Sequence, residues 1–200
     1  MKRLVLATSN RGKLAEIQPL LAGGNFSLVA QSELGVGDAV EDGASFIENA
    51  LLKARHACAA TGLPALADDS GLLVDALGGA PGLLSARYAG AHGDADANIR
   101  KLLGELGQVP EALRGAHFHC AIVLLRHTRD PQPLIAEGSW HGQILFAPRG
   151  DRGFGYDPVF FDPLLRATAA ELPAETKNRV SHRGQALREL AGRIGPWLQS

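Results

Sequence analysis

Two adjacent aspartates, Asp68 and Asp69, have the residue type and the position best suited to catalysis in this sequence. They follow the apolar run 64–67 and precede Ser70 and Gly71, which predicts two short strands separated by a turn. Open α/β sheets often carry reactive groups where strands end, and Mg²⁺ prefers one or two carboxylates together with waters and phosphate oxygens. Because neighbouring side chains of a regular strand point to opposite faces, both aspartates reach one ion only if the strand ends there. An exposed acidic turn is the alternative.

A second polar segment follows the apolar run 3–7 and precedes a helical pattern that reaches Leu21. Its residues are Thr8, Ser9, Asn10, Arg11, Gly12 and Lys13. The first amides of a helix and a nearby lysine favour a bound phosphate, although the glycine spacing of a Walker A loop is absent. The simpler alternative is that Asn10 caps the helix and Lys13 is solvated.

Glu41 lies in a polar loop before a long helix, whose start is predicted by the capping box at residues 45–48. Asn49 and Lys53 fall outside the apolar stripe of this helix. Glu41 is therefore a candidate second metal ligand, and Lys53 is a candidate second cation for phosphate. An acidic turn beside a helix and a solvated lysine are the alternatives.

The glycine-rich segment 153–158 contains Phe154, Gly155, Tyr156 and Asp157. Aromatic rings stack on nucleobases, glycines let the main chain approach a planar ligand, and the acid can accept hydrogen bonds from a base edge or sugar. A tight turn with one buried aromatic is the alternative.

Three further candidates for binding an anion, Lys177, His182 and Arg183, lie around the predicted start of the last helix, which Ser181 is expected to cap.

The overall charge argues against binding to a large polyanion. Twenty Lys and Arg face 21 Asp and Glu, so no broad positive field is available for nucleic acid or an anionic membrane. No stretch reaches the length of a membrane span. The two cysteines fall in predicted core segments and are expected to be reduced, which fits a cytoplasmic location.

The alternation of helical and strand patterns predicts an α/β fold, with a mixed central sheet flanked by helices, in a single domain spanning residues 1–200. Further elements are expected as strands at 26–30, 117–126 and 159–161, a helix at 95–106, a hairpin or bent strand at 134–146, and a terminal helix after Ser181.

Six motifs in this order give the sequence a family resemblance: ATSNRGK, EDGASFIENALLKA, ADDSGL, ALGGAPG, GFGYDP and SHRGQAL. Together they resemble the pyrophosphatases of noncanonical purine nucleoside triphosphates, also called inosine or xanthosine triphosphate pyrophosphatases, the Ham1-like family. The resemblance implies two lobes with an active-site cleft between them, a homodimer, and Mg²⁺-dependent cleavage between the α and β phosphates of ITP, dITP or XTP. It also implies removal of deaminated purines from the nucleotide pool.

In the family pattern, Asp69 accepts a proton and binds the metal, and Glu41 is a further ligand. The remaining matched positions bind substrate: Thr8 through Lys13, Lys53, Ser70, Phe154 through Asp157, Lys177, His182 and Arg183. Our hypothesis is that Mg²⁺, held by Asp69 with Glu41 or Asp68, bridges the phosphates while an activated water attacks phosphorus. The rival hypotheses are a pyrophosphatase for other modified nucleotides and a nucleotide-sensing protein that binds without cleaving.

Overall fold

The computed structural model describes residues 2–24 and 26–199, and its centre is a mixed seven-stranded sheet. The strand order is β2-β1-β3-β4-β5-β6-β7. The strands are β1 (Lys2–Leu6), β2 (Phe26–Ala30), β3 (Ala65–Val74), β4 (Gly115–Leu125), β5 (Leu134–Ile144), β6 (Phe160–Asp162) and β7 (Ala167–Thr168). β1 runs parallel to β2 and β3, whereas β6 runs antiparallel to β5 and β7, so the predicted mixed sheet is confirmed.

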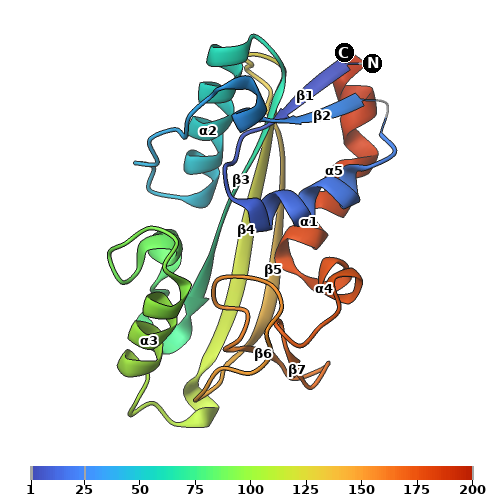
Figure 1. Cartoon of the computed structure of the whole chain (residues 1–200). Helices are drawn as coiled ribbons and strands as arrows, with labels where there is room; N and C mark the ends of the chain where they lie inside the picture. The colour runs from blue at the N-terminus through green and yellow to red at the C-terminus, as the bar shows by residue number, and fades with distance from the viewer. Residues whose placement is uncertain (1, 25, 200) are drawn as a thin grey trace. The chain divides into compact units, whose positions relative to one another are not determined.

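Five α-helices belong to the described part of the chain (Figure 1). They are α1 (Arg11–Leu21), α2 (Phe46–Thr61), α3 (Ala95–Glu105), α4 (Ala174–Val180) and α5 (His182–Gln199). Short 3-10 helices add η1 (Gln31–Leu34), η2 (Asp75–Leu77), η3 (Gly82–Arg87) and η4 (Glu111–Leu113). The sequence patterns predict four of the α-helices, and the short α4 is the one they miss.

The chain divides into two compact units, and β3, β4 and β5 each contribute residues to both. The described residues of unit 1 fall within 1–69, 120–138 and 182–200, and those of unit 2 fall within 70–119 and 139–181. The cleft implied by the family resemblance stays a prediction.

In unit 1, helices pack on both faces of the strands (Figure 1). Alternate strand residues such as Leu6 and Leu66 belong to a core that includes side chains of α1 and α5. Their neighbours, such as Val5 and Ala67, belong to a second core that includes side chains of α2. The period of two in a strand thus assigns the unit 1 side chains of β3, residues 65–69, alternately to the face with α1 and α5 and to the face with α2.

The predicted turn at Ser70 and Gly71 is wrong, because β3 continues through both residues as one ten-residue strand. Apolar residues on either side of the acidic pair are almost fully buried and favour an extended chain throughout, with Ala67 and Leu72 at most 1% exposed. The alternation of side chains is therefore kept, with Asp68 on the Leu66 face and Asp69 on the Ala67 face.

The core of unit 2 is built around aromatic rings. Phe118 and Trp140 pack against Phe160, and the Trp140 indole donates a hydrogen bond to Asp162 at 2.8 Å. Of the two forms expected for the segment 134–146, a hairpin or a bent strand, the hairpin is wrong, because β5 is a single strand. Gly142 lets β6 approach β5 closely, since a Cβ there would lie 2.4 Å from the carbonyl oxygen of Phe161 on the paired strand.

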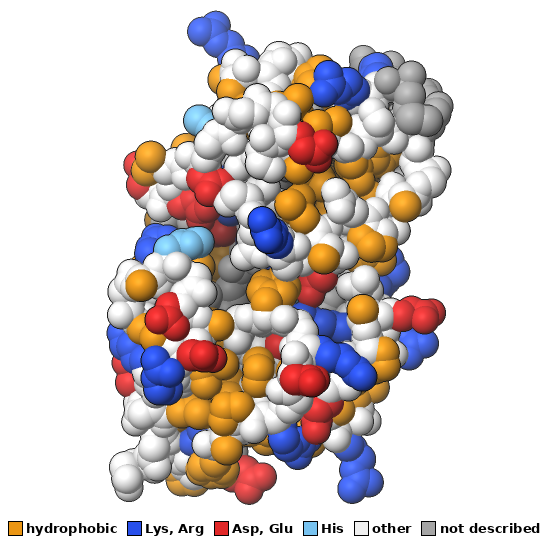
Figure 2. Space-filling view, in the orientation of Figure 1, with side chains coloured by type: hydrophobic (Ala, Val, Ile, Leu, Met, Phe, Trp, Pro, Cys, Tyr) orange, Lys and Arg blue, Asp and Glu red, His pale blue; other side chains and the backbone are white. Residues whose placement is uncertain are grey.

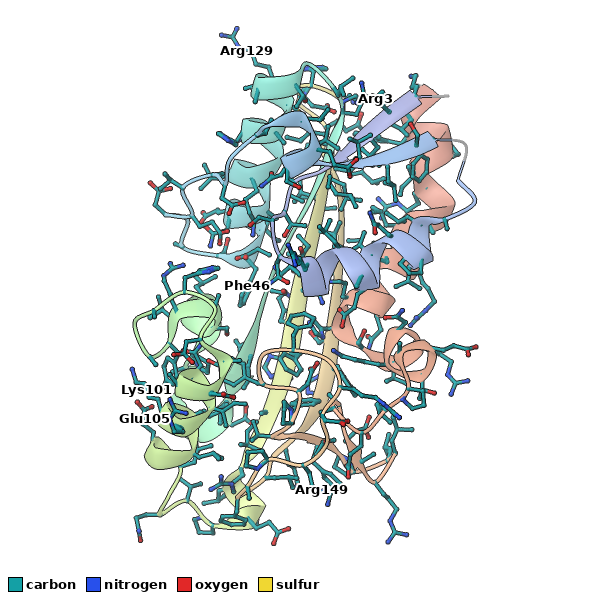
Figure 3. All side chains as sticks on the ribbon, viewed as in Figure 1. Arg3, Phe46, Lys101, Glu105, Arg129 and Arg149 are labelled. Carbon is teal, nitrogen blue, oxygen red and sulfur yellow. The ribbon has the colours of Figure 1, made fainter. Side chains whose placement is uncertain are left out.

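Both signs of charge are exposed on the described surface. Lys101 and Glu105 lie one turn apart on the outer side of α3, 3.9 Å from each other (Figure 3). Basic and acidic side chains are interspersed on the face drawn in Figure 2. Both cysteines are reduced and buried as predicted, and burial raises the pKa of the Cys58 thiol to about 11. Within residues 2–24 and 26–199, no helix has the length and apolarity to cross a membrane.

Candidate active site

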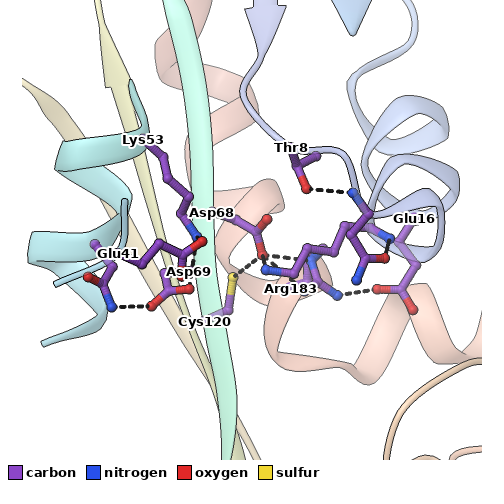
Figure 4. A network of polar contacts seen from close by, with 11 residues as sticks. Thr8, Glu16, Glu41, Lys53, Asp68, Asp69, Cys120 and Arg183 are labelled. Carbon is purple, nitrogen blue, oxygen red and sulfur yellow. Dashed lines mark hydrogen bonds and ion pairs between the residues drawn. The ribbon is translucent and has the colours of Figure 1, made fainter. Parts of the chain in front are cut away.

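The carboxylate of Asp69 is held from α2, in unit 1, by two side chains one helical turn apart (Figure 4). Lys53 donates from Nζ to Oδ1 at 2.8 Å, and Asn49 donates from Nδ2 to Oδ2 at 3.2 Å. Lys53 also lies 3.3 Å from a carboxylate oxygen of Glu41, which comes from the loop before α2. The structure therefore brings Glu41 and Asp69 to one ammonium group, as a shared metal site would require of its ligands.

Lys53 keeps its positive charge in this buried position. Burial lowers the pKa of its ammonium group, but the carboxylates of Asp69, Asp68 and Glu41 raise it further, so the net pKa lies above the ordinary value. Lys53 is 8% exposed as a whole residue. The charged ammonium group of Lys53 thus compensates the carboxylates of Glu41 and Asp69.

The loop that carries Glu41 is attached to α2 by hydrogen bonds. The side-chain amide oxygen of Asn49, Oδ1, accepts the main-chain N–H of Gly43 at 2.9 Å. Ser45 caps the helix by accepting the N–H of Glu48 at 3.2 Å, as predicted. Asn49 therefore contacts both Asp69 and the loop that brings Glu41.

Asp68 points to the opposite face of β3 and forms a separate ionic cluster (Figure 4). Its Oδ2 accepts from Arg183 Nε at 3.2 Å and Nη2 at 3.0 Å, and it lies 3.2 Å from Lys13 Nζ. Arg183 also pairs with Glu16 through Nη1. These contacts join β3, α1 and α5, so Asp68 fixes two of the cations that sequence reasoning assigned to substrate.

Burial alone would raise the pKa of the Asp68 carboxyl, but the charges of Lys13, Arg183 and Lys53 hold it well below its usual range. Burial lowers the pKa of the Arg183 guanidinium, and the carboxylates of Asp68 and Glu16 reverse this, so its pKa is raised. Burial and the nearby Asp68 charge together raise the pKa of the Cys120 thiol to about 12. Asp68 and Arg183 are thus charged, and Cys120 is a neutral thiol.

The side chains of the two ionic clusters do not balance in charge. The cations are Lys13, Lys53 and Arg183, and the carboxylates are Glu16, Glu41, Asp68 and Asp69. Three positive against four negative charges leave one net negative charge, which would repel a triphosphate. A bound divalent cation would reverse the sign, and Glu41 and Asp69 supply the carboxylate oxygens that Mg²⁺ prefers.

The segment 8–13 has the predicted passage from strand to helix. Asn10 caps α1 by accepting the N–H of Lys13 at 3.1 Å, and Thr8 accepts the N–H of Asn10 at 3.2 Å. Ser9 donates to Asp38 at 2.6 Å, and Asp38 also accepts from a buried glutamine of η1. Asp38 was missed by sequence reasoning, because no motif marks it. The remaining members, Arg11 and Gly12, form the first turn of α1.

Lys177 lies on a helix of its own and not at the start of the last helix. Lys177 belongs to α4 in unit 2, whereas His182 and Arg183 open α5 in unit 1 and are both buried. Ser181 is the residue after the last turn of α4. The absence of a side chain at Gly138 lets β5 pass close to the start of α5, since a Cβ there would lie 2.1 Å from the His182 carbonyl oxygen.

Unit 2 holds a second polar group around the glycine-rich turn. Asp157 accepts the N–H of Phe154 at 2.8 Å and the ammonium of Lys177 at 2.5 Å. The same ammonium lies 4.9 Å from the centroid of the Phe154 ring. Gly153 has φ +75°, and a Cβ there would lie 2.0 Å from an Asp157 carboxylate oxygen, so the turn depends on glycine.

The two aromatics of the turn have different surroundings. Phe154 is half-buried, whereas Tyr156 is 4% exposed and donates its hydroxyl to the carbonyl of Ser85 at 2.9 Å. Burial raises the pKa of the Tyr156 hydroxyl. Of the two rings, Phe154 is therefore the more exposed. Ser70 is half-buried on β3 at the start of unit 2.

No group of three or more His, Cys, Asp and Glu side chains within the described ranges 2–24 and 26–199 is arranged to hold a metal ion. The pair Glu41 and Asp69 nevertheless fits a hydrated Mg²⁺, because that ion is commonly bound by one or two carboxylates and completes its shell with waters and phosphate oxygens.

A model of the Ham1 family matches residues 4–193. A dITP/XTP pyrophosphatase of Xylella fastidiosa strain 9a5c is 62% identical over 190 residues, which cover 95% of this chain and 96% of the relative. A dITP/XTP pyrophosphatase of Yersinia pseudotuberculosis is 58% identical over 188 residues, covering 94% and 95% of the two chains.

Two solved structures have the same fold. A HAM1 protein from Coxiella burnetii superposes with a TM-score of 0.91 at 48% identity, covering 98% of this chain and all of the other. The Ham1 protein of Staphylococcus aureus gives a TM-score of 0.86 at 37% identity over 98% of this chain and all of that one.

Proposed function

The chain belongs to the Ham1 family, and from this premise we propose that it hydrolyses deaminated purine nucleoside triphosphates, namely dITP, ITP and XTP. The products are the nucleoside monophosphate and pyrophosphate. The observation that carries the proposal is the pairing of Glu41 and Asp69 across Lys53, at 3.3 and 2.8 Å. Relatives that bear the name dITP/XTP pyrophosphatase match nearly the whole chain, which supports the substrate class.

In this proposal, Mg²⁺ is held by Asp69 and Glu41. When bound, the ion polarises phosphate oxygens and neutralises charge that develops during the reaction. Glu41 is preferred to Asp68 as the second ligand, because Asp68 faces Lys13 and Arg183 on the other side of β3.

Asp69 acts as the base that takes a proton from the attacking water. Its position supports this role, because the side chain is 9% exposed and both oxygens are oriented by donors from α2. Lys53 stays protonated and offsets negative charge on the phosphates. A positioned base of this kind contributes about 10²- to 10⁴-fold to the rate.

The segment 8–13 and Lys13 bind the phosphates of the substrate. The amides at the N-terminus of α1 and the ammonium group of Lys13 favour an anion there. Because Lys13 is already paired with Asp68, its ammonium group is held in place before the substrate arrives.

We assign recognition of the 6-oxo edge of the base to His182, Arg183 and main-chain groups near Phe154. Lys177 neutralises phosphate charge, and the remaining substrate contacts come from Ser70 and Gly155 through Asp157. Donors aimed at a 6-oxo group would meet another donor in the 6-amino group of adenine, leaving buried groups unpaired. We expect dATP to be a poor substrate. GTP shares the 6-oxo group and is the harder substrate to exclude.

The deciding experiment incubates the purified protein with dITP and Mg²⁺ and separates the products. Pyrophosphate and dIMP in equal amounts support the proposal, whereas orthophosphate alone would place the cleavage elsewhere. A panel of XTP, ITP, dATP, dGTP and modified pyrimidine triphosphates tests the rival pyrophosphatase. Binding of dITP without any product would favour the sensing protein.

We further propose a homodimer that works in the cytoplasm, where free nucleotides are deaminated. Large apolar side chains exposed on unit 2 support an association surface, with Phe146 59%, Leu113 63% and Leu164 94% exposed. Light scattering coupled to size exclusion measures the mass of the assembly. A mass of one chain at micromolar concentration contradicts the dimer.

A further inference from the structure

Asn49 of α2 makes side-chain hydrogen bonds to both the proposed base and the loop that brings the second proposed metal ligand. We propose that it is a positioning residue that fixes the Asp69 carboxylate and ties the Glu41 loop to it, and thereby sets how the two acids face a divalent cation. The inference rests on the proposed function and names a residue that acts through Asp69 and Gly43.

The amide of Asn49 has partners that suit both of its ends. Its oxygen accepts the Gly43 N–H at 2.9 Å, and its nitrogen donates to Asp69 Oδ2 at 3.2 Å. A carboxylate only accepts and a main-chain N–H only donates, so the reversed amide would place like groups together. Asn49 is 2% exposed, so these bonds are not exchanged for bonds to bulk water. The chemistry at this position therefore requires a neutral side chain with one donor end and one acceptor end.

The chain at Gly43 leaves room for this contact. A Cβ built at Gly43 would lie 2.8 Å from the Asn49 side-chain oxygen and 2.8 Å from the Glu48 Cβ. The loop can approach α2 this closely because residue 43 has no side chain. The position of Glu41, two residues earlier, follows from that approach.

Asn49 and Lys53 divide the work of holding Asp69. Lys53 contacts Oδ1 and Asn49 contacts Oδ2, so rotation of the carboxylate about its Cβ–Cγ bond would break one bond or the other. A second cation at position 49 would further neutralise Asp69 and weaken its attraction for a metal ion. A neutral amide orients the carboxylate and leaves its charge available.

Asn98 of α3 provides a matched control in unit 2. Both asparagines occupy the fourth position of their helices and are almost fully buried, Asn49 at 2% and Asn98 at 3%. Asn98 also accepts a main-chain N–H, that of Ala89 at 2.7 Å, but its amide nitrogen faces the carbonyls of Ser85 and Ala86 at 3.4 Å. The two positions thus share a structural role and differ in the carboxylate contact.

The test compares Asn49→Ala with Asn98→Ala, and Asn49→Ser serves as a milder second variant. Thermal unfolding reports stability. Electron paramagnetic resonance of free Mn²⁺ reports metal binding, both without nucleotide and with the α,β-methylene analogue of dITP, which is not cleaved. Steady-state kinetics with dITP separates kcat from KM. The metal titration needs no turnover, so it reads the effect on the site directly.

We expect Asn49→Ala to weaken Mn²⁺ binding about tenfold or more and to lower kcat about tenfold or more, with KM for dITP changed by less than about threefold. Asn49→Ser should fall between it and the unaltered protein. Asn98→Ala should lose as much thermal stability as Asn49→Ala and leave the affinity for Mn²⁺ unchanged. Equal Mn²⁺ affinity and equal kcat in Asn49→Ala and Asn98→Ala would overturn the positioning role. If the unaltered protein binds Mn²⁺ but releases no pyrophosphate from dITP, the proposed function fails, and the metal titration still decides the role of Asn49.

Discussion

Substitution by asparagine should mainly lower stability at Asp68 and mainly lower activity at Asp69. Asp68→Asn removes the charge that pairs with Lys13 and Arg183, and the Asp68 side chain is 0% exposed. Breaking a buried ion pair from one side costs about 3–5 kcal/mol, and this range applies here because Lys13 and Arg183 lose the same carboxylate and Glu16 remains beside Arg183 alone. For a chain of this length, each kcal/mol lowers Tm by about 2–4 °C, so a fall of about 6–20 °C is expected.

Asp69→Asn should instead remove activity with a smaller loss of stability. Asparagine keeps the shape of the side chain, and Lys53 keeps its contact with Glu41 at 3.3 Å. The lost charge-assisted hydrogen bond costs about 1–3 kcal/mol. Loss of the general base lowers kcat by about 10²- to 10⁴-fold, and weaker metal binding adds to this.

The assay pairs thermal unfolding with pyrophosphate release from dITP at a temperature at which both variants are folded. Asp68→Asn should keep kcat within about tenfold of the unaltered protein, because its effect on chemistry passes through the placement of Lys13 and Arg183. The reasoning would be refuted if Asp68→Asn kept its Tm within about 2 °C and lost as much kcat as Asp69→Asn. Asp68 would then belong to the reacting centre.

Further predictions concern pH, the glycine-rich turn and the metal. Asp130 accepts hydrogen bonds from the Arg126 side chain and main chain, which hold the pKa of its carboxyl well below the unfolded value of about 3.9. The stability it contributes is present above that value and is lost as pH falls toward the folded pKa, so Asp130→Asn should cost about 1–3 kcal/mol at pH 7 and progressively less below pH 4 in urea unfolding. Gly153→Ala places a Cβ 2.0 Å from an Asp157 oxygen and should lower kcat/KM for dITP by about 10²-fold, and a change under twofold would show that this turn is not needed. EDTA should abolish pyrophosphate release, and added Mg²⁺ should restore it; full activity in EDTA would exclude the metal role of Glu41 and Asp69.

Local signals predicted the elements that carry the candidate site. The capping serine at Ser45 and the apolar stripe that follows fixed the start of α2, and Asn10 capped α1 where the strand-to-helix passage was expected. These features depend on residues three or four positions apart, so one sequence is sufficient to find them.

Contacts between distant segments set the rest, and one sequence does not report them. The orientation of Asp68 follows from Arg183, which lies 115 residues away along the chain. The turn expected at Ser70 and Gly71 is part of a continuous strand, in which residues from other elements compensate the charges of both aspartates. The seven-residue α4, which carries Lys177, has a proline before its first turn and no side-chain cap there, so no capping residue marked its start.

Because β3 runs without a break through Asp68 and Asp69, the number of residues in the strand decides which face each side chain occupies. Insertion or deletion of one residue between Leu66 and Asp68 would turn each carboxylate to the other face of the strand. One aspartate would then take the place of the other, and the second would lie two residues, about 6.6 Å along the strand, from the place that faces its cation. The apolar side chains on one side of the insertion or deletion would also turn to the other face of the strand and meet the wrong core. Asp68 and Asp69 therefore cannot replace each other, although they are identical neighbours. We expect this strand to tolerate substitutions better than changes of length.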